Sequence, residues 1–307
     1  MITKRIIDEK GIDQTEDTVL VLGYFDGLHK GHQALFEKAR EIATEQGLKI
    51  AVLTFPESPK LAFVRYQPEL MLHLASPEDR MAQLESLGVD YLYLIDFTSH
   101  FAGNTARDFF EKYVSRLRAK AVVAGFDYHF GSDRKESHEL RDYFNGKIVI
   151  VPSVNLDNRK ISSTRIRETI AVGDMLKTQE LLGYPLSTRG IVVHGNARGR
   201  TIGYPTANLA PLDRVRLPGD GVYVADVEHN GQRYRGMASV GKNFDGDELR
   251  FEVNIFDFSQ DIYGDTIRIF WLDKIREMVK FEGIDSLVAQ LQSDERIARS
   301  WTGYRNS

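Results

Sequence analysis

The first half of the chain alternates between short apolar runs and longer segments whose apolar residues repeat at helical spacing. The apolar runs predict strands at residues 18–22, 49–55, 91–95, 121–124 and 147–151. The helical spacing predicts helices at residues 32–46, 76–87, 105–117 and 163–172. Strands that alternate with helices indicate an α/β domain, in which helices cover both faces of a parallel sheet. A sheet of this kind binds its ligand beyond the carboxyl ends of its strands.

The pattern changes after Tyr184-Pro185, where short strands replace the helices. Strands are predicted at residues 189–193, 221–228, 232–240, 250–256 and 266–272, and His229-Asn230-Gly231 has the composition of a hairpin turn. One helix, from residue 284 to about residue 299, closes the chain. Five or six short strands with one helix indicate a small antiparallel β-barrel. We therefore expect two domains, at residues 1–184 and 185–307.

Composition narrows the range of partners. The length of 307 residues agrees with two domains, and the net charge of −4 argues against a protein that coats nucleic acid or an anionic membrane. There is no cysteine, which excludes disulfides, thiolate metal sites and a cysteine nucleophile and favours the cytoplasm. The apolar runs are too short to span a bilayer. Weak self-association stays open, because no feature of the sequence defines an oligomeric state.

The first candidate site follows the strand at residues 18–22, where Gly-Tyr-Phe-Asp-Gly-Leu-His-Lys-Gly-His leads into a helix. Glycines let the backbone approach a ligand, and the N–H groups at the start of the helix suit a phosphate. Two histidines there can donate hydrogen bonds to phosphoryl oxygens; helix capping and a metal pair are the alternatives. The candidate residues are Gly23, Phe25, Asp26, His29, Gly31 and His32.

Two later stretches add to this site. In Ile-Ser-Ser-Thr-Arg-Ile-Arg the hydroxyls can cap a helix, but arginines in a first helical turn are unfavourable unless an anion binds there. Ser163, Thr164 and Arg167 are therefore candidates for polyphosphate binding. The loop at residues 125–131 follows a predicted strand, and its aromatic residues either stack on a flat ring system or anchor the loop. Asp127, Tyr128 and Phe130 are its candidate ligand residues.

The second candidate site is the run His-Gly-Asn-Ala-Arg-Gly-Arg-Thr-Ile-Gly-Tyr-Pro-Thr-Ala-Asn at residues 194–208. Glycines with nearby arginines are typical of a phosphate loop, although a hairpin connection with solvated arginines would have the same composition. Its candidates are Gly195, Arg198, Gly199 and Arg200. Thr206 and Asn208 project to the same side of an extended segment, and their oxygens suit Mg²⁺ shared with substrate phosphates.

Together these motifs resemble the family of bacterial bifunctional riboflavin kinases/FAD synthetases, whose N-terminal domain is an FMN adenylyltransferase. The resemblance extends over nearly the whole chain and implies a Rossmann-like nucleotidyltransferase sheet followed by a six-stranded barrel. It implies that His29 and His32 stabilise the phosphates of ATP, that Ser163, Thr164 and Arg167 hold its β- and γ-phosphates, and that residues 127–130 help seat the flavin. The substrates and products would be ATP, riboflavin, FMN and FAD.

The resemblance also assigns residues in the barrel. Glu252 would be the base that deprotonates the riboflavin hydroxyl, and Arg276 would contact the flavin; without the resemblance, Glu252 is an outward carboxylate on a strand. Gly-x-Pro-Thr-Ala-Asn is specific to riboflavin kinases. FMN needs no such base in the adenylyl transfer, because its phosphate is already a nucleophile.

The chain departs from the family pattern at four places. Residues 55–59 lack the usual histidine, Asn254 replaces a histidine, the turn at 241–245 lacks two residues, and Met278 stands where a carboxylate is common. A shortened turn that shifted the strand register would turn Glu252 to the other face. This keeps open an FAD synthetase whose barrel binds flavin without phosphorylating it. A flavin-sensing protein and an enzyme with another acceptor are the further alternatives.

Overall fold

The computed structural model describes residues 1–307 except 8, 13, 196–198, 200–201, 243–248 and 304–307. The chain divides into two compact units. The first consists of residues 1–73 and 77–162, and the second of residues 74–76 and 163–307. The domain boundary expected at 184–185 lies inside the second unit, and the limits of the functional domains stay a prediction.

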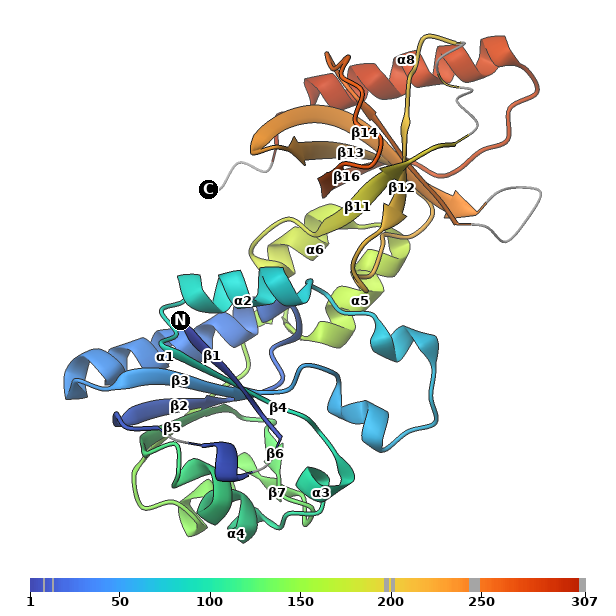
Figure 1. Ribbon diagram of the computed structural model, residues 1–307. Coiled ribbons are helices and arrows are strands. Elements are labelled where there is room, and N and C mark those ends of the chain that lie inside the picture. The colour runs from blue at the N-terminus through green and yellow to red at the C-terminus, as the bar shows by residue number, and fades with distance from the viewer. Residues whose placement is uncertain (8, 13, 196–198, 200–201, 243–248, 304–307) are drawn as a thin grey trace. The chain divides into compact units, whose positions relative to one another are not determined.

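A parallel sheet forms the centre of the first unit (Figure 1). Its described strands are β1 (Ile2–Ile6), β2 (Thr18–Leu22), β3 (Lys49–Thr54), β4 (Tyr91–Ile95), β5 (Ala119–Gly125) and β8 (Lys147–Val151). They lie in the order β1-β4-β3-β2-β5-β8, and every pair is parallel. The carboxyl ends of β2, β3 and β5 therefore lie side by side at one edge.

Both faces of this sheet are covered, which explains the uninterrupted apolar run in β2. Val19 and Val21 pack into the core under α1 (Lys30–Gln46), whereas Leu20 and Leu22 pack into the core on the opposite face. α2 (Pro77–Ser86) adds Leu84 to the first core. The opposite core contains residues of α4 (Ala106–Phe109) and of the π-helical turn Phe110–Val114, which follow α3 (Ser99–Ala102) (Figure 1).

Two small hairpins and several short helical turns lie between these elements. β6 (His129–Phe130) pairs with β7 (Lys135–Glu136), and β9 (Asn155–Leu156) pairs with β10 (Arg159–Lys160). The 3-10 turns are Glu9–Gly11, Asp26–Leu28, Pro59–Ala62, Pro68–Met71 and Ser137–Asp142. Asp157 and Asn158 both have positive φ, as the two-residue turn between β9 and β10 requires.

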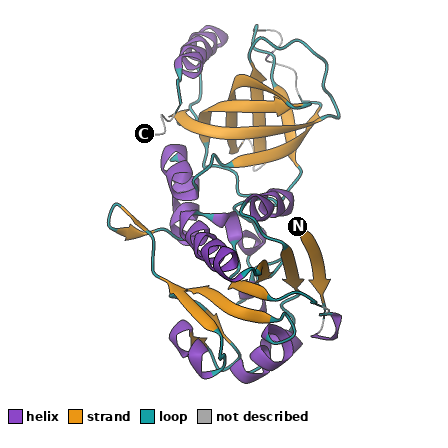
Figure 2. Ribbon diagram, turned by 90° about the vertical axis from the view of Figure 1, so that its left-hand side faces the viewer, coloured by secondary structure: helices purple, strands orange, loops and turns teal. Residues whose placement is uncertain are grey.

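The strands of the second unit close into a barrel, which Figure 2 shows. They are β11 (Ser187–Val193), β12 (Ala207–Pro211), β13 (Gly221–His229), β14 (Gln232–Lys242), β15 (Leu249–Ile255) and β16 (Thr266–Arg276). Their order is β11-β12-β15-β14-β13-β16, all neighbours are antiparallel, and β16 returns to β11. α5 (Ser163–Val172), α6 (Met175–Leu182) and α8 (Ile284–Ser300) belong to the same unit.

The structure confirms the predicted fold class, with a parallel α/β sheet followed by an antiparallel barrel and a final helix. Sequence reasoning missed β1, because this edge strand pairs only with β4 and most of its side chains are exposed. It also missed β12 and α6. The helix expected at 105–117 is α4 followed by the π-helical turn. Within the described residues, no helix has the length and apolar character to cross a membrane.

Candidate active sites

The turn after β2 is shaped by Phe25 at the carboxyl edge of the first sheet. Phe25 has a left-handed backbone with φ 56°, and its buried ring packs on Phe36 with 5.2 Å between centroids. A Cβ on Gly23 would lie 2.7 Å from that ring, so glycine lets the ring fold back over the turn. The role of Phe25 in the structure is packing, and its place in a nucleotide site stays a prediction.

His29 and His32 lie face to face at the start of α1. Their rings stack with centroids 3.7 Å apart, and the backbone N–H of His32 donates to His29 Nδ1 at 3.3 Å. Burial lowers the pKa of His32 well below 6.5, and His29, Arg80 and Lys160 lower it further. Among the described residues, the buried Nδ1 of His32 has no hydrogen-bond partner. A neutral imidazole with an unused buried nitrogen is suited to contact a ligand.

Arg80 is a buried cation in this site that the sequence reasoning missed. From α2 it donates to the Phe55 carbonyl at 2.8 Å, to Thr54 Oγ1 at 2.5 Å and to the Tyr24 carbonyl. Burial lowers its pKa, while Tyr24 and nearby carboxylates oppose that shift. It therefore joins the ends of β2 and β3. The available signal was its spacing of four residues from Leu84, which places both side chains on the buried face of α2.

Asp26 and Gly31 complete the turn around the histidines. Asp26 is buried, with 3% of its surface exposed. A Cβ on Gly31 would lie 3.1 Å from the His29 ring and 3.6 Å from the carbonyl oxygen of Ile161. The segment after β10 therefore passes directly beside the start of α1, and glycine provides the space for it.

In the loop at residues 125–131, Asp127 and Phe126 contact Lys160, and Tyr128 and Phe130 stack on one another. Lys160 pairs with Asp127 at 2.5 Å and lies over the Phe126 ring at 4.5 Å. Burial raises the pKa of Tyr128, whose ring stacks with that of Phe130 at 6.3 Å. Phe130 itself is buried in the core against aromatic rings of α4 and the π-helical turn. The structure thus gives Phe130 a packing role, and its predicted flavin contact remains untested.

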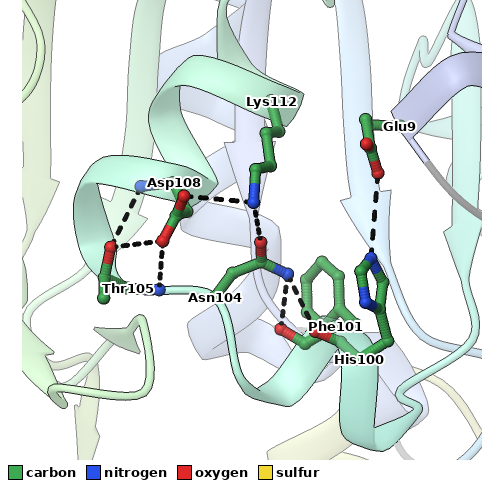
Figure 3. A network of polar contacts seen from close by, with 7 residues as sticks. All are labelled: Glu9, His100, Phe101, Asn104, Thr105, Asp108 and Lys112. Carbon is green, nitrogen blue, oxygen red and sulfur yellow. Dashed lines mark hydrogen bonds and ion pairs between the residues drawn. The ribbon is translucent and has the colours of Figure 1, made fainter.

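A polar network lies in the segment at residues 104–112 (Figure 3), which contacts the end of this loop. Lys112 bridges Asn104 at 2.9 Å and Asp108 at 3.0 Å, and Asp108 forms a capping box with Thr105. These hydrogen bonds hold the pKa of the Asp108 carboxyl at about 2. The braced segment meets the loop at Gly131, where a Cβ would lie 2.4 Å from the backbone nitrogen of residue 106. The loop at 125–131 is therefore anchored by packing at Phe130 and Gly131.

His73 and Glu57 form a second pair of side chains, next to Tyr24. Glu57 belongs to the segment 55–59, which lacks the histidine usual in the family. Tyr24 Oη and His73 Nδ1 are 3.2 Å apart, and His73 Nε2 lies 3.3 Å from Glu57 Oε2. His73 is buried. The loop after β3 lacks a histidine of its own, but the structure places one next to it from 16 residues further along the chain (73 − 57).

Ser163, Thr164 and Arg167 lie in the first turns of α5, as predicted. They belong to the second unit, whereas His29 and His32 belong to the first. The grouping of these residues in one nucleotide site therefore stays a prediction.

The barrel contains a cavity of about 670 Å³ that gathers most of the predicted kinase residues. Its wall includes Gly195, Gly199, Thr206, Asn208, Glu252 and Arg276. Asn208 on β12 lies directly opposite Glu252 on β15 in the strand register. A Cβ on Gly195 would lie 2.2 Å from Asn208 Nδ2, and one on Gly199 would lie 3.3 Å from Thr206 Oγ1. The glycines therefore leave the space in which the two candidate metal ligands lie.

Glu252 faces the cavity, and Arg250 determines its orientation there. Arg250 Nε lies 3.0 Å from Glu252 Oε1, and the side chain of Glu252 is 15% exposed. Asn254, two residues further on, donates from Nδ2 to the Pro205 carbonyl at 2.6 Å. Asn254 thus secures the backbone just before Thr206.

Arg276 lines the cavity, and an ion pair with α8 fixes its side chain. Its Nε and Nη2 atoms contact the carboxylate of Asp294 on α8 at 2.8–3.1 Å, and Asp294 is fully buried. Its guanidinium also lies 5.6 Å from the centroid of the Phe281 ring. The predicted residues Arg198 and Arg200, and positions 243–245 of the shortened turn, lie outside the described residues. Among the described residues, no three His, Asp or Glu side chains form a metal-binding group.

The sequence matches two family models in tandem. FAD synthetase matches residues 11–165, and riboflavin kinase matches residues 182–302. The bifunctional riboflavin kinase/FMN adenylyltransferase of Listeria monocytogenes is 39% identical over 92% of each chain, and that of Bacillus subtilis is 37% identical over 93% of each. This chain belongs to the bifunctional riboflavin kinase/FMN adenylyltransferase family.

A solved structure from Streptococcus pneumoniae, described as a macrolide-efflux protein, is 56% identical and has a TM-score of 0.95. It covers 98% of this chain and is itself covered completely. Membership of the riboflavin kinase/FMN adenylyltransferase family agrees with the order of the two sites along the chain. At two of the four departures from the family pattern, the structure shows contacts of the residues there: Glu57, in the segment without the histidine, contacts His73, and Asn254 donates to the Pro205 carbonyl. Met278 lines the cavity.

Proposed function

We propose that this chain makes FMN and FAD in two consecutive steps. In the barrel, the γ-phosphate of ATP passes to the 5′-hydroxyl of riboflavin, which leaves FMN and ADP. In the first domain, the phosphate of FMN attacks the α-phosphorus of a second ATP, and pyrophosphate leaves as FAD forms. The observation that carries the proposal is the presence in one chain of both a stacked histidine pair at the sheet edge and an oxygen-lined cavity with a carboxylate in the barrel.

The adenylyl transfer requires charge stabilisation rather than a base. The FMN phosphate is already anionic, so the protein must hold two anions in line and stabilise the charge that develops on ATP. His29 and His32 fit this role, because the lowered pKa of His32 keeps that ring neutral and able to donate an N–H bond. Ser163, Thr164 and Arg167 would hold the outer phosphates, and Asp127 and Tyr128 would seat the flavin.

The kinase step requires a base, because a hydroxyl must lose its proton to attack phosphorus. Glu252 fits this role: it lies on the cavity wall, and Arg250 holds its carboxylate in place. Gly195 and Gly199 would bring the backbone close to ATP phosphates. Arg276 would border the flavin, with its orientation set by Asp294.

Mg²⁺ fits the oxygen atoms of Thr206 and Asn208, whose side chains lie where a Cβ on Gly195 or Gly199 would contact them. When bound, Mg²⁺ would neutralise phosphate charge and orient ATP. The protein's part is to hold these two side chains on one wall of the cavity. The substrates ATP, riboflavin and FMN suit an enzyme of the cytoplasm.

A second candidate function is FAD synthesis alone, with a barrel that binds flavin without phosphorylating it. The shortened turn at 241–245 favours this alternative. The common cavity of Thr206, Asn208 and Glu252 favours the kinase.

The test is a chromatographic product assay with Mg²⁺ and ATP. Riboflavin should yield FMN and FAD, and FMN should yield FAD. His32→Ala should abolish FAD formation from FMN and spare FMN formation from riboflavin, whereas Glu252→Ala should abolish FMN formation from riboflavin and spare FAD formation from FMN. FAD from FMN without turnover of riboflavin would establish the second candidate. Equal loss of both activities in either variant, each measured on its own substrate, would contradict two separate sites.

A further inference from the structure

Tyr204 lies between the glycine-rich run and the candidate metal ligands, and its side chain reaches α8. Its hydroxyl donates to Glu295 Oε2 at 3.0 Å. Its ring packs against a core cluster that includes Met237 and Ala298. Burial, and after it the bond to Glu295, raises the pKa of Tyr204. The phenol therefore stays protonated and keeps its donor hydrogen at neutral pH.

The position of Tyr204 and that of Thr206 are coupled through the backbone between them. The N–H of Tyr204 donates to the Gly199 carbonyl at 2.8 Å. A Cβ on Gly199 would lie 2.1 Å from the carbonyl oxygen of Tyr204 and 3.3 Å from Thr206 Oγ1, so the segment is tightly folded. Asn254 holds the carbonyl of Pro205. A displacement of Tyr204 would therefore displace Thr206 on the cavity wall.

α8 offers a rigid support for this contact. The fully buried carboxylate of Asp294, next to Glu295, forms the ion pair with Arg276 on β16 and also accepts from Gln290 Nε2 at 2.8 Å. Arg299 donates to Glu295 Oε1 at 2.8 Å, which leaves Oε2 directed at Tyr204. The two adjacent acids of α8 thus bind different parts of the barrel domain. Asp294 binds Arg276 in the cavity wall, and Glu295 binds Tyr204 in the segment that leads to Thr206.

We propose that the hydrogen bond between Tyr204 and Glu295 is a positioning contact for phosphoryl transfer, because it holds Thr206 where ATP phosphates and their cation bind. This inference rests on the proposed kinase function of the barrel. Tyr204 acts through Thr206 and need not touch the reacting atoms. Its loss should therefore weaken the use of ATP and leave the affinity for riboflavin nearly unchanged.

The test compares Tyr204→Phe with the wild type, since phenylalanine keeps the ring packing and removes only the hydroxyl. For riboflavin phosphorylation we expect kcat/KM for ATP to fall roughly tenfold, the loss typical of one hydrogen bond to a charged group. The KM for riboflavin should change less than twofold. Glu295→Ala should give the same loss, and the double variant should lose no more than either single variant.

Tyr234→Phe is the matched control, because it removes a tyrosine hydroxyl whose bond to Gln232 on the same barrel is exposed. It should leave both kinetic constants unchanged, and all variants should form FAD from FMN at the wild-type rate. A Tyr204→Phe protein with wild-type kcat/KM for ATP, or one that loses as much in KM for riboflavin, would overturn the inference.

Amide hydrogen exchange over residues 202–209 tests the contact independently of catalysis. Tyr204→Phe and Glu295→Ala should exchange faster there than Tyr234→Phe. If the wild type formed no FMN, the proposed kinase would fail, yet unchanged exchange in Tyr204→Phe would still refute the contact, and faster exchange would still support it.

Discussion

Replacing Arg80 by methionine should destabilise the first unit and impair FAD formation. Methionine keeps most of the aliphatic volume but removes the donors to the carbonyls of Tyr24 and Phe55 and to Thr54 Oγ1. The buried Phe55 carbonyl loses its Arg80 donor, at a cost of about 1–3 kcal/mol, whereas the Tyr24 carbonyl still accepts from Thr54 Oγ1 at 2.8 Å. Relief from burying a cation offsets part of the cost. We expect the free energy of unfolding to fall by about 2 kcal/mol.

The matched control is Arg40→Met, which removes one exposed hydrogen bond to the Leu87 carbonyl. Its cost should stay below about 1 kcal/mol. Urea unfolding followed by far-UV circular dichroism gives both values, and tryptophan fluorescence follows the second unit alone, since Trp271 and Trp301 both belong to it. FAD formation from FMN should fall in Arg80→Met, with FMN formation from riboflavin retained. Equal stability of the two variants would refute the role assigned to Arg80.

The remaining predictions concern both sites. Gly195→Ala should reduce FMN formation at least tenfold and leave FAD formation intact, because the new Cβ would meet Asn208 at 2.2 Å; steady-state kinetics with each substrate check this. Asn254→Ala should raise KM for ATP in the kinase assay, as it frees the Pro205 carbonyl; an unchanged KM would exclude that role. Burial lowers the pKa of His32 below 6.5, so below that pH the unfolded chain binds a proton that the folded chain does not. The free energy of unfolding should therefore decrease as the pH is lowered below 6.5, by up to about 1.4 kcal/mol per pH unit. Urea unfolding of His32→Gln, measured over the same pH range, should lack this part of the pH dependence.

Sequence patterns predicted the elements that are buried on a regular period. The runs at β2, β4 and β8 consist mainly of apolar residues, so the sequence pattern identified them with their correct bounds. β1 has mostly exposed side chains and lacks that signal. The short β12 follows a glycine-rich run and is held by pairing with β11 and β15, which no local pattern reveals.

The candidate sites divide in the same way. Local motifs pointed to His29, His32, Thr206 and Asn208, because the chemistry of these residues depends on neighbours within a few positions. Arg80 was missed because its partners lie 25 to 56 residues away and only the fold brings them together. The sequence pattern also did not predict that Phe130 packs into the core against Phe110, because this contact joins two separate segments.

The sequence by itself therefore determined the two architectures, their order and the identity of the chemical groups in each motif, since periodicity and glycine spacing are local properties. Only the tertiary structure decided that Asn208 faces Glu252, that His73 stands beside Glu57 and that α8 holds Tyr204. Each of these contacts joins residues distant in the chain. Their geometry depends on strand register and helix packing, which arise from the simultaneous burial of many side chains.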